Sequence, residues 1–394
     1  MTPLALAPIA TAAQSIQDWV VTRRRFLHQH PELSFEEEKT AAYVQRELKW
    51  LGYTRIHPNL NGNHSLCAEL LGRDSTRCIA LRADMDALPI QEETEGPFKS
   101  QVPGVSHMCG HDAHTAMLLG AARLLKEREA DLPCNVRLFF QGAEETSPGG
   151  ALDFIETGFL DGVESIYGIH VHPWTDTGTF NLTEGRALAG VETFSLRVFG
   201  KGGHAAYPHT TCDPVVAAAQ IITALQQIIS RTQNPFEPAV ISITKIHAGD
   251  AHNVIPEKVD LGGTIRSFRM DIHNHYAKLI MRIAQGVAEG FGCTVEYSTP
   301  GGYPPLINDP EACDRMRSVA TELFPGGILE ARPTMASEDF AHYTSRIPGA
   351  FGFLGVAEPA DSERYGLHHP RFRLDEDALW RGTALLATLA LEGR

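Results

Sequence analysis

The stretch HMCGHDAHT, residues 107–115, holds the side chains of this sequence that are best suited to bind a metal ion. It contains three histidines, one cysteine and one aspartate, and an apolar helical run, 116–125, follows directly. Thiolate and imidazole are ligands for zinc and similar transition metals, and a neighbouring carboxylate such as Asp112 can orient an imidazole. A buried thiol with capping groups before a helix would have the same composition. The metal interpretation therefore depends on matching ligands elsewhere in the chain.

Two pairs of acidic residues follow strand-like apolar runs. Asp84 and Asp86 come directly after one run, and Glu144 and Glu145 leave another. Carboxylates at the carboxyl ends of strands in an α/β sheet lie where active sites are usually built. Asp84 and Asp86 could orient metal ligands or could simply form a turn. Adjacent carboxylates beside a buried strand repel each other unless a cation is present, so one of Glu144 and Glu145 could be a ligand and the other a base. The alternative for this second pair is an exposed acidic turn.

Four further histidines are candidates for the same site. His170 and His172 end an apolar run that Pro173 is expected to terminate. Alternation places both on one face of an extended chain, and His170 is the better ligand candidate because it lies within the run. His368 or His369, shortly before the last amphipathic segment, could complete a metal site. Alone, either would more often be a surface histidine.

The order of expected elements predicts two domains, which is also what a length of 394 residues favours. Near the N-terminus, 15–28 has helical spacing, and a second helix is expected to start with Ser34 as its N-cap and Glu37 as the partner of a capping box. From residue 192 to residue 298 the pattern reads strand, helix, strand, strand, helix, strand, which is typical of a ferredoxin-like unit. We therefore predict a discontinuous α/β domain, 1–183 and 299–394, with an inserted α+β domain, 184–298.

Two loops and one arginine of the expected insertion could contact a ligand. Glycines surround His204 in 200–205 and would let the main chain approach a ligand closely, although a flexible hairpin with an incidental histidine is the alternative. Asn253 lies in a second loop, and Arg266 ends a strand, where its guanidinium could clamp a carboxylate with two hydrogen bonds.

Composition limits the classes of partner. A formal net charge of -14 argues against nucleic acid, because phosphate binding requires a basic surface. The seven cysteines are widely scattered, which suits a reducing compartment. The mildly apolar segment 2–13 has no basic region before it and is too short to span a membrane. We expect a cytoplasmic protein without a membrane partner.

Together these motifs resemble a known enzyme family over nearly the whole chain. The sequence is similar to the di-metal amidohydrolases and metallopeptidases that include aminoacylases, hippurate hydrolases, carboxypeptidases and plant auxin-conjugate hydrolases, and most of all to the branch with a cysteine ligand. The matching segments are RRxxHxHPELSFEE at 24–38, RADMDALP at 82–89, HMCGHDAHT at 107–115, GAEE at 142–145, GIHVHP at 168–173, GKGGHAAYPH at 200–209, HNVIPEKVDLGGTIRSF at 252–268, SEDF at 337–340 and LHHPRF at 367–372. One departure is Gly142, where the family more often has proline.

The resemblance implies a fold, a cofactor and residue roles. The fold would be a phosphorylase/hydrolase-like catalytic domain with a mixed sheet and an inserted ferredoxin-like domain that acts as a lid or dimerisation domain. Two divalent metal ions per subunit, zinc, manganese, cobalt or nickel, would activate water to cleave the amide bond of N-acyl-amino acids. Glu144 would be the general base, and Asp84, Asp86 and Asp112 would support the ligands. The implied metal ligands are Cys109, His111, Glu145, His170 and His368, and the implied substrate-binding residues are His204, Asn253 and Arg266.

Three further expectations concern partners and alternatives. The resemblance suggests a homodimer or higher homo-oligomer in which Asn253 would reach a partner subunit's site. A dipeptidase or carboxypeptidase with the same centre is the alternative enzyme. A metal-binding protein without turnover is a remote alternative, because the base and every ligand position are present.

Overall fold

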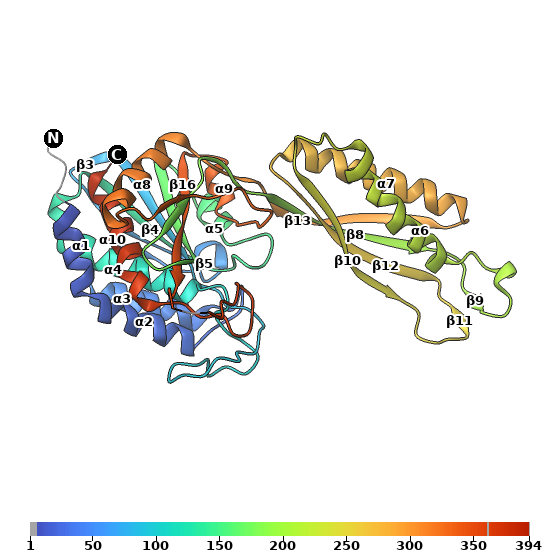
Figure 1. Cartoon of the computed structure of the whole chain (residues 1–394), viewed down its shortest axis with the longest axis horizontal. Helices are drawn as coiled ribbons and strands as arrows, with labels where there is room; N and C mark the ends of the chain where they lie inside the picture. The colour runs from blue at the N-terminus through green and yellow to red at the C-terminus, as the bar shows by residue number, and fades with distance from the viewer. Residues whose placement is uncertain (1–5, 361, 394) are drawn as a thin grey trace. The chain divides into compact units, whose positions relative to one another are not determined.

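The computed structural model describes residues 6–360 and 362–393, which form two compact units (Figure 1). Unit 1 contains the described residues up to Ala187, together with Ile307–Arg332 and those from Asp339 onward. Unit 2 is Leu188–Leu306 with Pro333–Glu338. Its main part starts and ends slightly later in the sequence than the predicted insertion, 184–298. The short segment Pro333–Glu338 was not part of that prediction.

Unit 1 is built on an eight-stranded mixed sheet in the order β1-β2-β4-β3-β5-β16-β6-β15. Its central strands run parallel, with β3 between β4 and β5 and with β16 on the other side of β5. The carboxyl ends of these strands therefore meet at one edge of the sheet, as an α/β active site requires. The strands are β1 (Ile56–His57), β2 (Leu66–Leu70), β3 (Asp74–Asp84), β4 (Cys134–Gln141), β5 (Ser165–Asp176), β6 (Phe180–Leu182), β15 (Ile328–Glu330) and β16 (Gly349–Ala357).

Helices cover both faces of this sheet. On one face the buried helix α4 packs against α2 and α10, with α1 against α10 (Figure 1). On the other face, Phe139 of β4 stacks on Phe154 of α5 and contacts Tyr343 of α9. Because side chains alternate along a strand, Arg82, Asp84 and Gln141 share the face of Phe139. The helices are α1 (Leu6–Ser15), α2 (Gln17–Gln29), α3 (Glu38–Trp50), α4 (His111–Glu127), α5 (Ala151–Glu156), α8 (Pro310–Leu323), α9 (Ala341–Thr344) and α10 (Leu379–Glu392).

Two predicted boundaries in unit 1 were wrong. Helix α3 begins at Glu38, and the N–H groups of Lys39 and Thr40 in its first turn donate to the Glu32 carboxylate at 3.2 and 2.8 Å, so Ser34 and Glu37 do not form the predicted capping box. Strand β5 continues through Pro173 to Asp176. Proline is tolerated there because β3 pairs with β5 only up to Gly168, which leaves one side of the strand without a ladder, and the pairing with β16 is itself irregular at this point. The mildly apolar segment near the N-terminus is helical from Leu6, the first described residue.

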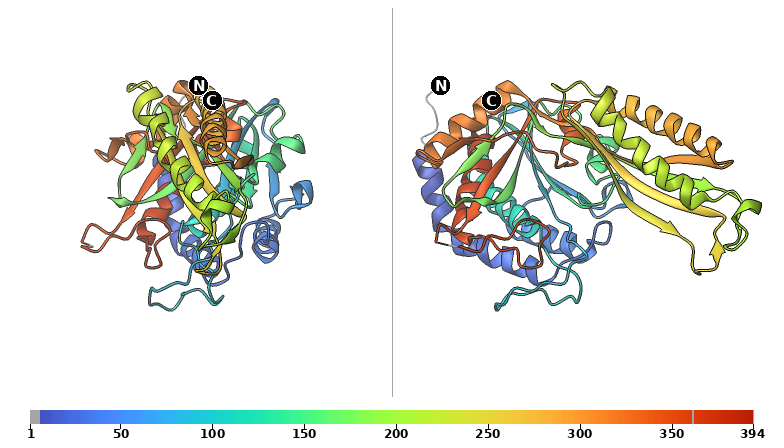
Figure 2. Two further views of the ribbon diagram at one scale, coloured as in Figure 1. Left: turned by 90° about the vertical axis from the view of Figure 1, so that its right-hand side faces the viewer. Right: turned by 45° about the vertical axis from the view of Figure 1, so that its right-hand side comes forward.

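Unit 2 has the predicted ferredoxin-like order of elements. Its antiparallel sheet is ordered β10-β12-β8-β13, and α6 and α7 lie side by side on one face of it (Figures 1 and 2). Alternate residues of β8, such as Phe194 and Leu196, are buried beneath these helices. The elements are β8 (Gly190–Phe199), α6 (Pro214–Gln227), β10 (Ala239–Ala248), β12 (Lys258–Ser267), α7 (Met270–Gly290) and β13 (Thr294–Tyr303), and β9 (Gly203–His204) forms a two-stranded sheet with β11 (Val254–Ile255). A further two-stranded sheet, β7 (Gly185–Leu188) with β14 (Leu306–Asn308), belongs mostly to unit 1.

The fold is thus mixed α/β with an inserted α+β unit, as predicted. Among the described residues, every helix is too short or too polar to cross a bilayer.

Gly120 of α4 marks the closest approach of the helices beneath the large sheet. A Cβ atom there would lie 2.8 Å from Val20 Cγ2 of α2 and 2.9 Å from Thr383 of α10. Both neighbours are β-branched and cannot rotate away. We expect Gly120→Ala to lower the free energy of unfolding by about 1–3 kcal/mol despite the better helix propensity of alanine. Gly286→Ala on the exposed face of α7, where no atom lies within 4 Å, is the matched control and should be neutral or stabilising. Scanning calorimetry of both variants tests the difference.

Candidate metal centre

Five potential metal donors converge at the carboxyl edge of the large sheet. Cys109 and His111 lie at the start of α4, Glu145 follows β4, His170 lies in β5, and His368 comes from the loop before α10. Cys109 Sγ is 3.4 Å from His170 Nε2, and His368 Nε2 is 3.1 Å from Glu145 Oε1. The ligand atoms of Cys109, His111 and His170 lie within 4.8 Å of one another, as do those of Cys109, Glu145 and His368. The structure therefore brings together the donors that the sequence predicted.

The backbone around these donors is held in unusual conformations. Gly110 has φ +87°, and a Cβ atom there would lie 2.4 Å from Val171 Cγ2, so only glycine fits between Cys109 and α4. His368 also has positive φ, 64°, and its N–H donates to Met108 O at 2.7 Å. This bond ties the loop of His368 to the segment that carries Cys109.

Hydrogen bonds fix the orientation of two donor imidazoles. His111 Nδ1 donates to Asp86 Oδ1 at 3.1 Å, and His170 Nδ1 donates to the Val171 carbonyl at 2.7 Å. In its neutral form each ring therefore presents Nε2 to the cluster as an acceptor. His111 Nε2 is buried and has no hydrogen-bond partner among the described residues. An inward lone pair without a partner, beside a thiol and carboxylates, fits a bound cation.

His114 lies next to the cluster, but both of its ring nitrogens are engaged. Nδ1 donates to Asp84 Oδ1 at 2.6 Å, and Nε2 accepts from the Val171 N–H at 2.9 Å. His114 therefore supports β5 and cannot also coordinate through Nε2. The sequence analysis gave it no separate role, although it lay in the same nine-residue stretch.

The electrostatics of the cluster also favour a cation. Burial, followed by the carboxylates of Glu145 and Glu144, raises the pKa of Cys109 well above its usual value. Burial alone would lower the pKa of His111, but Asp84 and Asp86 outweigh it and raise the pKa to about 10. A divalent cation would reverse both effects, because it stabilises thiolate and neutral imidazole as ligands.

Asp112 supports His28, a histidine that is not one of the five donors. Its Oδ2 lies 2.8 Å from Arg24 Nε and 2.8 Å from His28 Nδ1, and His28 Nε2 is 3.3 Å from Glu92 Oε1. Burial alone would raise the pKa of Asp112, but Arg24 and His28 hold it well below its usual range. The cluster joins α2 to the first turn of α4.

Glu144 lies beside the donors in a buried hydrogen-bond network. Its Oε1 accepts from the backbone N–H of Asp339 at 3.3 Å. The Asp339 side chain accepts from Arg82 Nη2 and from Gln141 Nε2, both at 2.7 Å. Arg82 Nη1 also donates to Asp84 at 2.7 Å. The motifs that contain Arg82 and Asp339 were visible in the sequence, but nothing indicated that the two side chains are partners.

The three predicted substrate-binding residues lie in unit 2. His204 pairs with Val254 between β9 and β11, and Ala205 N donates to Asn253 O, so the two loops form one ribbon. Both side chains are exposed. Arg266 ends β12, half-buried, and its Nη1 donates to Met335 O at 2.7 Å.

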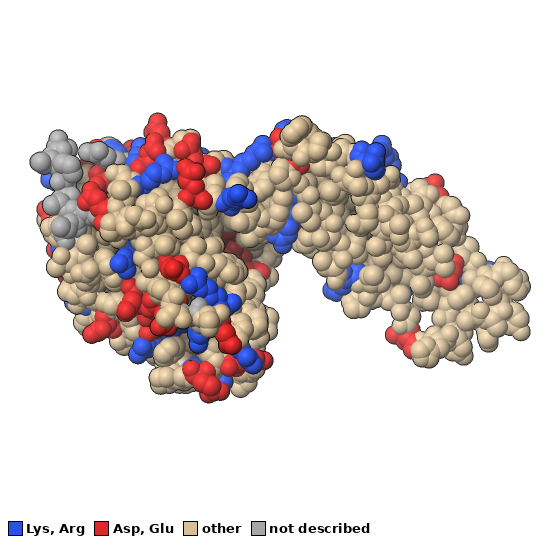
Figure 3. Space-filling view, in the orientation of Figure 1, with Lys and Arg blue, Asp and Glu red and all other residues tan. Residues whose placement is uncertain are grey.

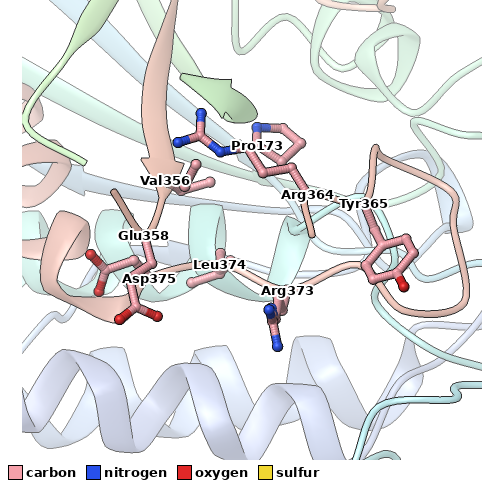
Figure 4. Close-up of a pocket in the computed structure, with 9 residues that line it drawn as sticks. Pro173, Val356, Glu358, Arg364, Tyr365, Arg373, Leu374 and Asp375 are labelled. Atoms are coloured by element: carbon pink, nitrogen blue, oxygen red, sulfur yellow. The ribbon is translucent and has the colours of Figure 1, made fainter. Parts of the chain in front are cut away.

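A separate small hollow, with a volume of about 50 Å³, opens beside the end of β16 in unit 1 (Figure 4). Two arginines, Arg364 and Arg373, and two carboxylates, Glu358 and Asp375, line it, with Tyr365 at one end. None of the five donors lines it. Its mixed charges select no single class of ligand, so the chemistry of the chain is better assigned to the donor cluster.

Comparison with known proteins identifies the family. The model of Peptidase family M20/M25/M40 matches residues 80–392. The chain belongs to this family. It is 40% identical over 385 residues to the N-acetylcysteine deacetylase of Bacillus subtilis, which covers 94% of this chain and 96% of that protein. It is 43% identical over 296 residues to the N-acyl-L-amino acid amidohydrolase of Geobacillus stearothermophilus, with 75% of this chain and 80% of that one covered.

A solved structure supports the same assignment for this M20 family chain. A Bacillus subtilis protein, described as a dinuclear metal binding peptidase from the M20 family, superposes with a TM-score of 0.81 at 36% identity. The alignment covers 96% of this chain and 98% of that one. The resemblance found in the sequence is thereby confirmed at the level of family and fold.

The three acceptor bonds of Asp86 generate a prediction about metal binding. Asp86 accepts from His111 Nδ1, from Ser34 Oγ and from Glu145 N. An asparagine has one acceptor oxygen, so its amide nitrogen would face at least one of these donors. We expect Asp86→Asn to weaken metal affinity by about 10- to 100-fold.

Asp74→Asn, at the exposed start of β3, is the control and should leave metal affinity unchanged. Competition with a chromophoric chelator measures both variants. Parent-like affinity in Asp86→Asn would show that the bond to His111 does not support a ligand.

Proposed function

We propose that this protein is a metal-dependent amidohydrolase that cleaves the amide bond of N-acyl-amino acids. The observation that carries the proposal is the cluster of five donors, of which only His368 is exposed, with Glu144 beside it, in a chain similar to an N-acetylcysteine deacetylase and an N-acyl-L-amino acid amidohydrolase. The proposed ligands are Cys109, His111, Glu145, His170 and His368. Asp84 and Asp86 support them through His114 and His111.

Glu144 has the position of a general base. Two divalent cations, when bound, would lower the pKa of water and polarise the amide carbonyl. Glu144 takes the proton from the attacking water and then delivers it to the leaving amine nitrogen. The Asp339 N–H, which donates to Glu144 Oε1, orients the carboxylate while the other oxygen handles the proton. The Arg82–Asp339 ion pair holds that N–H in place.

The proposed substrate contacts come from unit 2. Arg266 would bind the carboxylate of the substrate's amino-acid part, because the geometry of a guanidinium matches that of a carboxylate. In the structure Arg266 donates to the backbone carbonyl of Met335. A substrate carboxylate would replace this backbone acceptor. His204 and Asn253 would bind the reacting carbonyl or the acyl group.

The donor chemistry limits which metals are candidates. Thiolate and imidazole favour zinc, whereas a carboxylate also suits manganese, and cobalt and nickel can occupy the same set. We propose zinc, manganese, cobalt or nickel as candidates to be separated by reconstitution.

We further propose that the chain is a cytoplasmic homodimer or higher oligomer that associates through unit 2. The face of unit 2 shown in Figure 3 carries few charged side chains. Strand β10 forms one edge of its sheet, with Ile246 58% exposed, and an unpaired strand edge can pair with a second copy. The described cysteines are all free, as expected in a reducing compartment.

Substrate class is tested with a panel of N-acetyl-, N-benzoyl- and indole-acetyl-amino acids alongside dipeptides. Apo-protein is reloaded separately with zinc, manganese, cobalt or nickel, and release of the free amino acid is measured. We expect metal-dependent cleavage of the acyl-amino acids. A peptidase is the second candidate, because the family and the superposed structure are described as peptidases. Cleavage confined to dipeptides would favour it, and a metal-loaded chain inert to the whole panel would favour a binding protein without turnover.

The roles of the two adjacent carboxylates are tested by separate substitutions. Glu144→Gln should keep metal content but lower kcat by about 10²- to 10⁴-fold, because only proton transfer is removed. Glu145→Ala should lose bound metal as well as turnover, because it deletes a ligand. Metal content by atomic emission and kcat on the best substrate of the panel are measured together. Parent-like turnover in Glu144→Gln would remove Glu144 from the base role.

A further inference from the structure

The segment between α2 and α3, residues 30–37, contains two polar side chains that the mechanism above does not use. Ser34 and Glu37 were predicted to cap a helix, but neither does so. Phe35 between them has φ +66°, which turns the chain sharply. Glu37 instead reaches the loop that follows β4 and carries Glu144, and Ser34 reaches Asp86, which bonds the same loop.

Glu37 holds the residue before Glu144. Its Oε1 accepts from the Ala143 N–H at 2.7 Å and from the Phe35 N–H at 3.1 Å. The side chain is fully buried. A Cβ atom on Gly142 would lie 3.0 Å from Glu37 Oε1, so the main chain of the loop rests directly on the carboxyl group. Ala143 has φ +53°, a conformation that alanine rarely adopts and that the surrounding contacts must impose.

Ser34 acts on the residue after Glu144 through one intermediary. Its hydroxyl donates to Asp86 Oδ2 at 2.7 Å, and the same oxygen accepts from the Glu145 N–H at 2.9 Å. The backbone amides on both sides of Glu144 are therefore held by hydrogen bonds that depend on one short N-terminal segment.

We propose that Ser34 and Glu37 form a clamp that positions the backbone of Glu144 for proton transfer. This inference rests on the proposed role of Glu144 as general base. Both are positioning residues, since their contacts are to backbone amides and to Asp86. Displacement of a catalytic group by about 1 Å can cost about 10²-fold in rate, so a loop held in a strained conformation needs such anchors.

The chemistry of Glu37 supports a positioning role over a stabilising one. Burial, followed by the Asp86 carboxylate, raises the pKa of Glu37 to about 7. Its Oε2 is buried and has no hydrogen-bond partner among the described residues. A carboxyl group in this environment costs folding free energy, and groups of this kind concentrate at functional sites.

The clamp is tested with two substitutions that differ only in hydrogen bonding. Glu37→Gln keeps an acceptor oxygen for the Ala143 N–H, whereas Glu37→Leu has similar size and no acceptor. Glu36→Gln and Glu36→Leu are matched controls, because Glu36 is the adjacent exposed carboxylate. Three quantities are measured for each metal-loaded protein: kcat and KM on the best substrate of the panel, metal content, and hydrogen exchange of peptides covering 141–147.

We expect Glu37→Leu to lower kcat by about 10- to 100-fold with KM and metal content nearly unchanged, and to accelerate exchange in 141–147. Glu37→Gln should stay close to the parent in all three. Ser34→Ala, which removes one hydroxyl and is the milder variant if Glu37→Leu does not fold, should lower kcat by a smaller factor and accelerate exchange in the same peptides.

Other results would overturn the clamp. The clamp would be overturned if Glu37→Leu had the same kcat and hydrogen exchange as Glu36→Leu. It would also be overturned if Glu37→Leu lost kcat without any change in the hydrogen exchange of residues 141–147. Should Glu37→Leu fail to fold, parent-like exchange and kcat in Ser34→Ala would have the same meaning. A parent inert to the whole panel would instead count against the proposed function, and the exchange measurements would still decide whether the two side chains anchor this loop.

Discussion

The structure of unit 1 depends on balancing the negative charge buried at the carboxyl edge of its large sheet. Asp84, Asp86, Glu144 and Asp339 are all nearly inaccessible to water. An isolated buried carboxylate is strongly unfavourable, so each must meet positive charge or several hydrogen-bond donors. Arg82 supplies charge to Asp84 and to Asp339. The negative charge that Arg82 does not balance lies on the side of His111 and Glu145, where the donor cluster would hold its cations.

Backbone N–H groups also stabilise these buried carboxylates by hydrogen bonding. Glu144 accepts from Asp339 N, Asp86 from Glu145 N, and Asp339 from Ala151 N. Each bond joins segments that are distant in the sequence, so the loops at this edge fix one another. Positive φ at Ala143 and at His368 shows that these loops are bent to meet the site. Such strain is usual where a fold positions catalytic groups.

The sequence predicted the parts of this arrangement that have a local signature. Apolar runs with carboxylates or histidines at their ends indicated strands that deliver ligands to one edge, and the element order indicated the ferredoxin-like insertion. Ser34 and Glu37 were misinterpreted because serine followed three residues later by glutamate is also the pattern of a capping box. Local periodicity cannot distinguish a side chain that turns back on its own helix from one that reaches a distant loop.

The pairings that were missed all join distant positions. Arg82 and Asp339 are separated by 257 residues, and His28 and Asp112 by 84. Each residue was part of a visible motif, but a motif gives residue type and spacing and does not give the partner. The continuation of β5 through Pro173 was missed for a related reason, because proline is excluded only where a neighbouring strand needs its N–H. Whether a strand has such a neighbour is decided by the sheet as a whole.

The donor set also explains how charge could stay balanced during the reaction. As the proposed ligands, Cys109 as thiolate and Glu145 would be anionic, whereas His111, His170 and His368 would bind as neutral imidazoles. Two divalent cations would therefore leave the centre with excess positive charge, which Glu144 offsets as a carboxylate. In the proposed mechanism Glu144 would lose that charge on accepting the proton of water, and negative charge would develop on the carbonyl oxygen of the substrate at the same moment. The excess positive charge thus becomes available when the transition state requires it, and a preorganised site gains rate in this way. The amides on either side of Glu144 must stay fixed for this exchange, and Ser34 and Glu37 are placed to hold them.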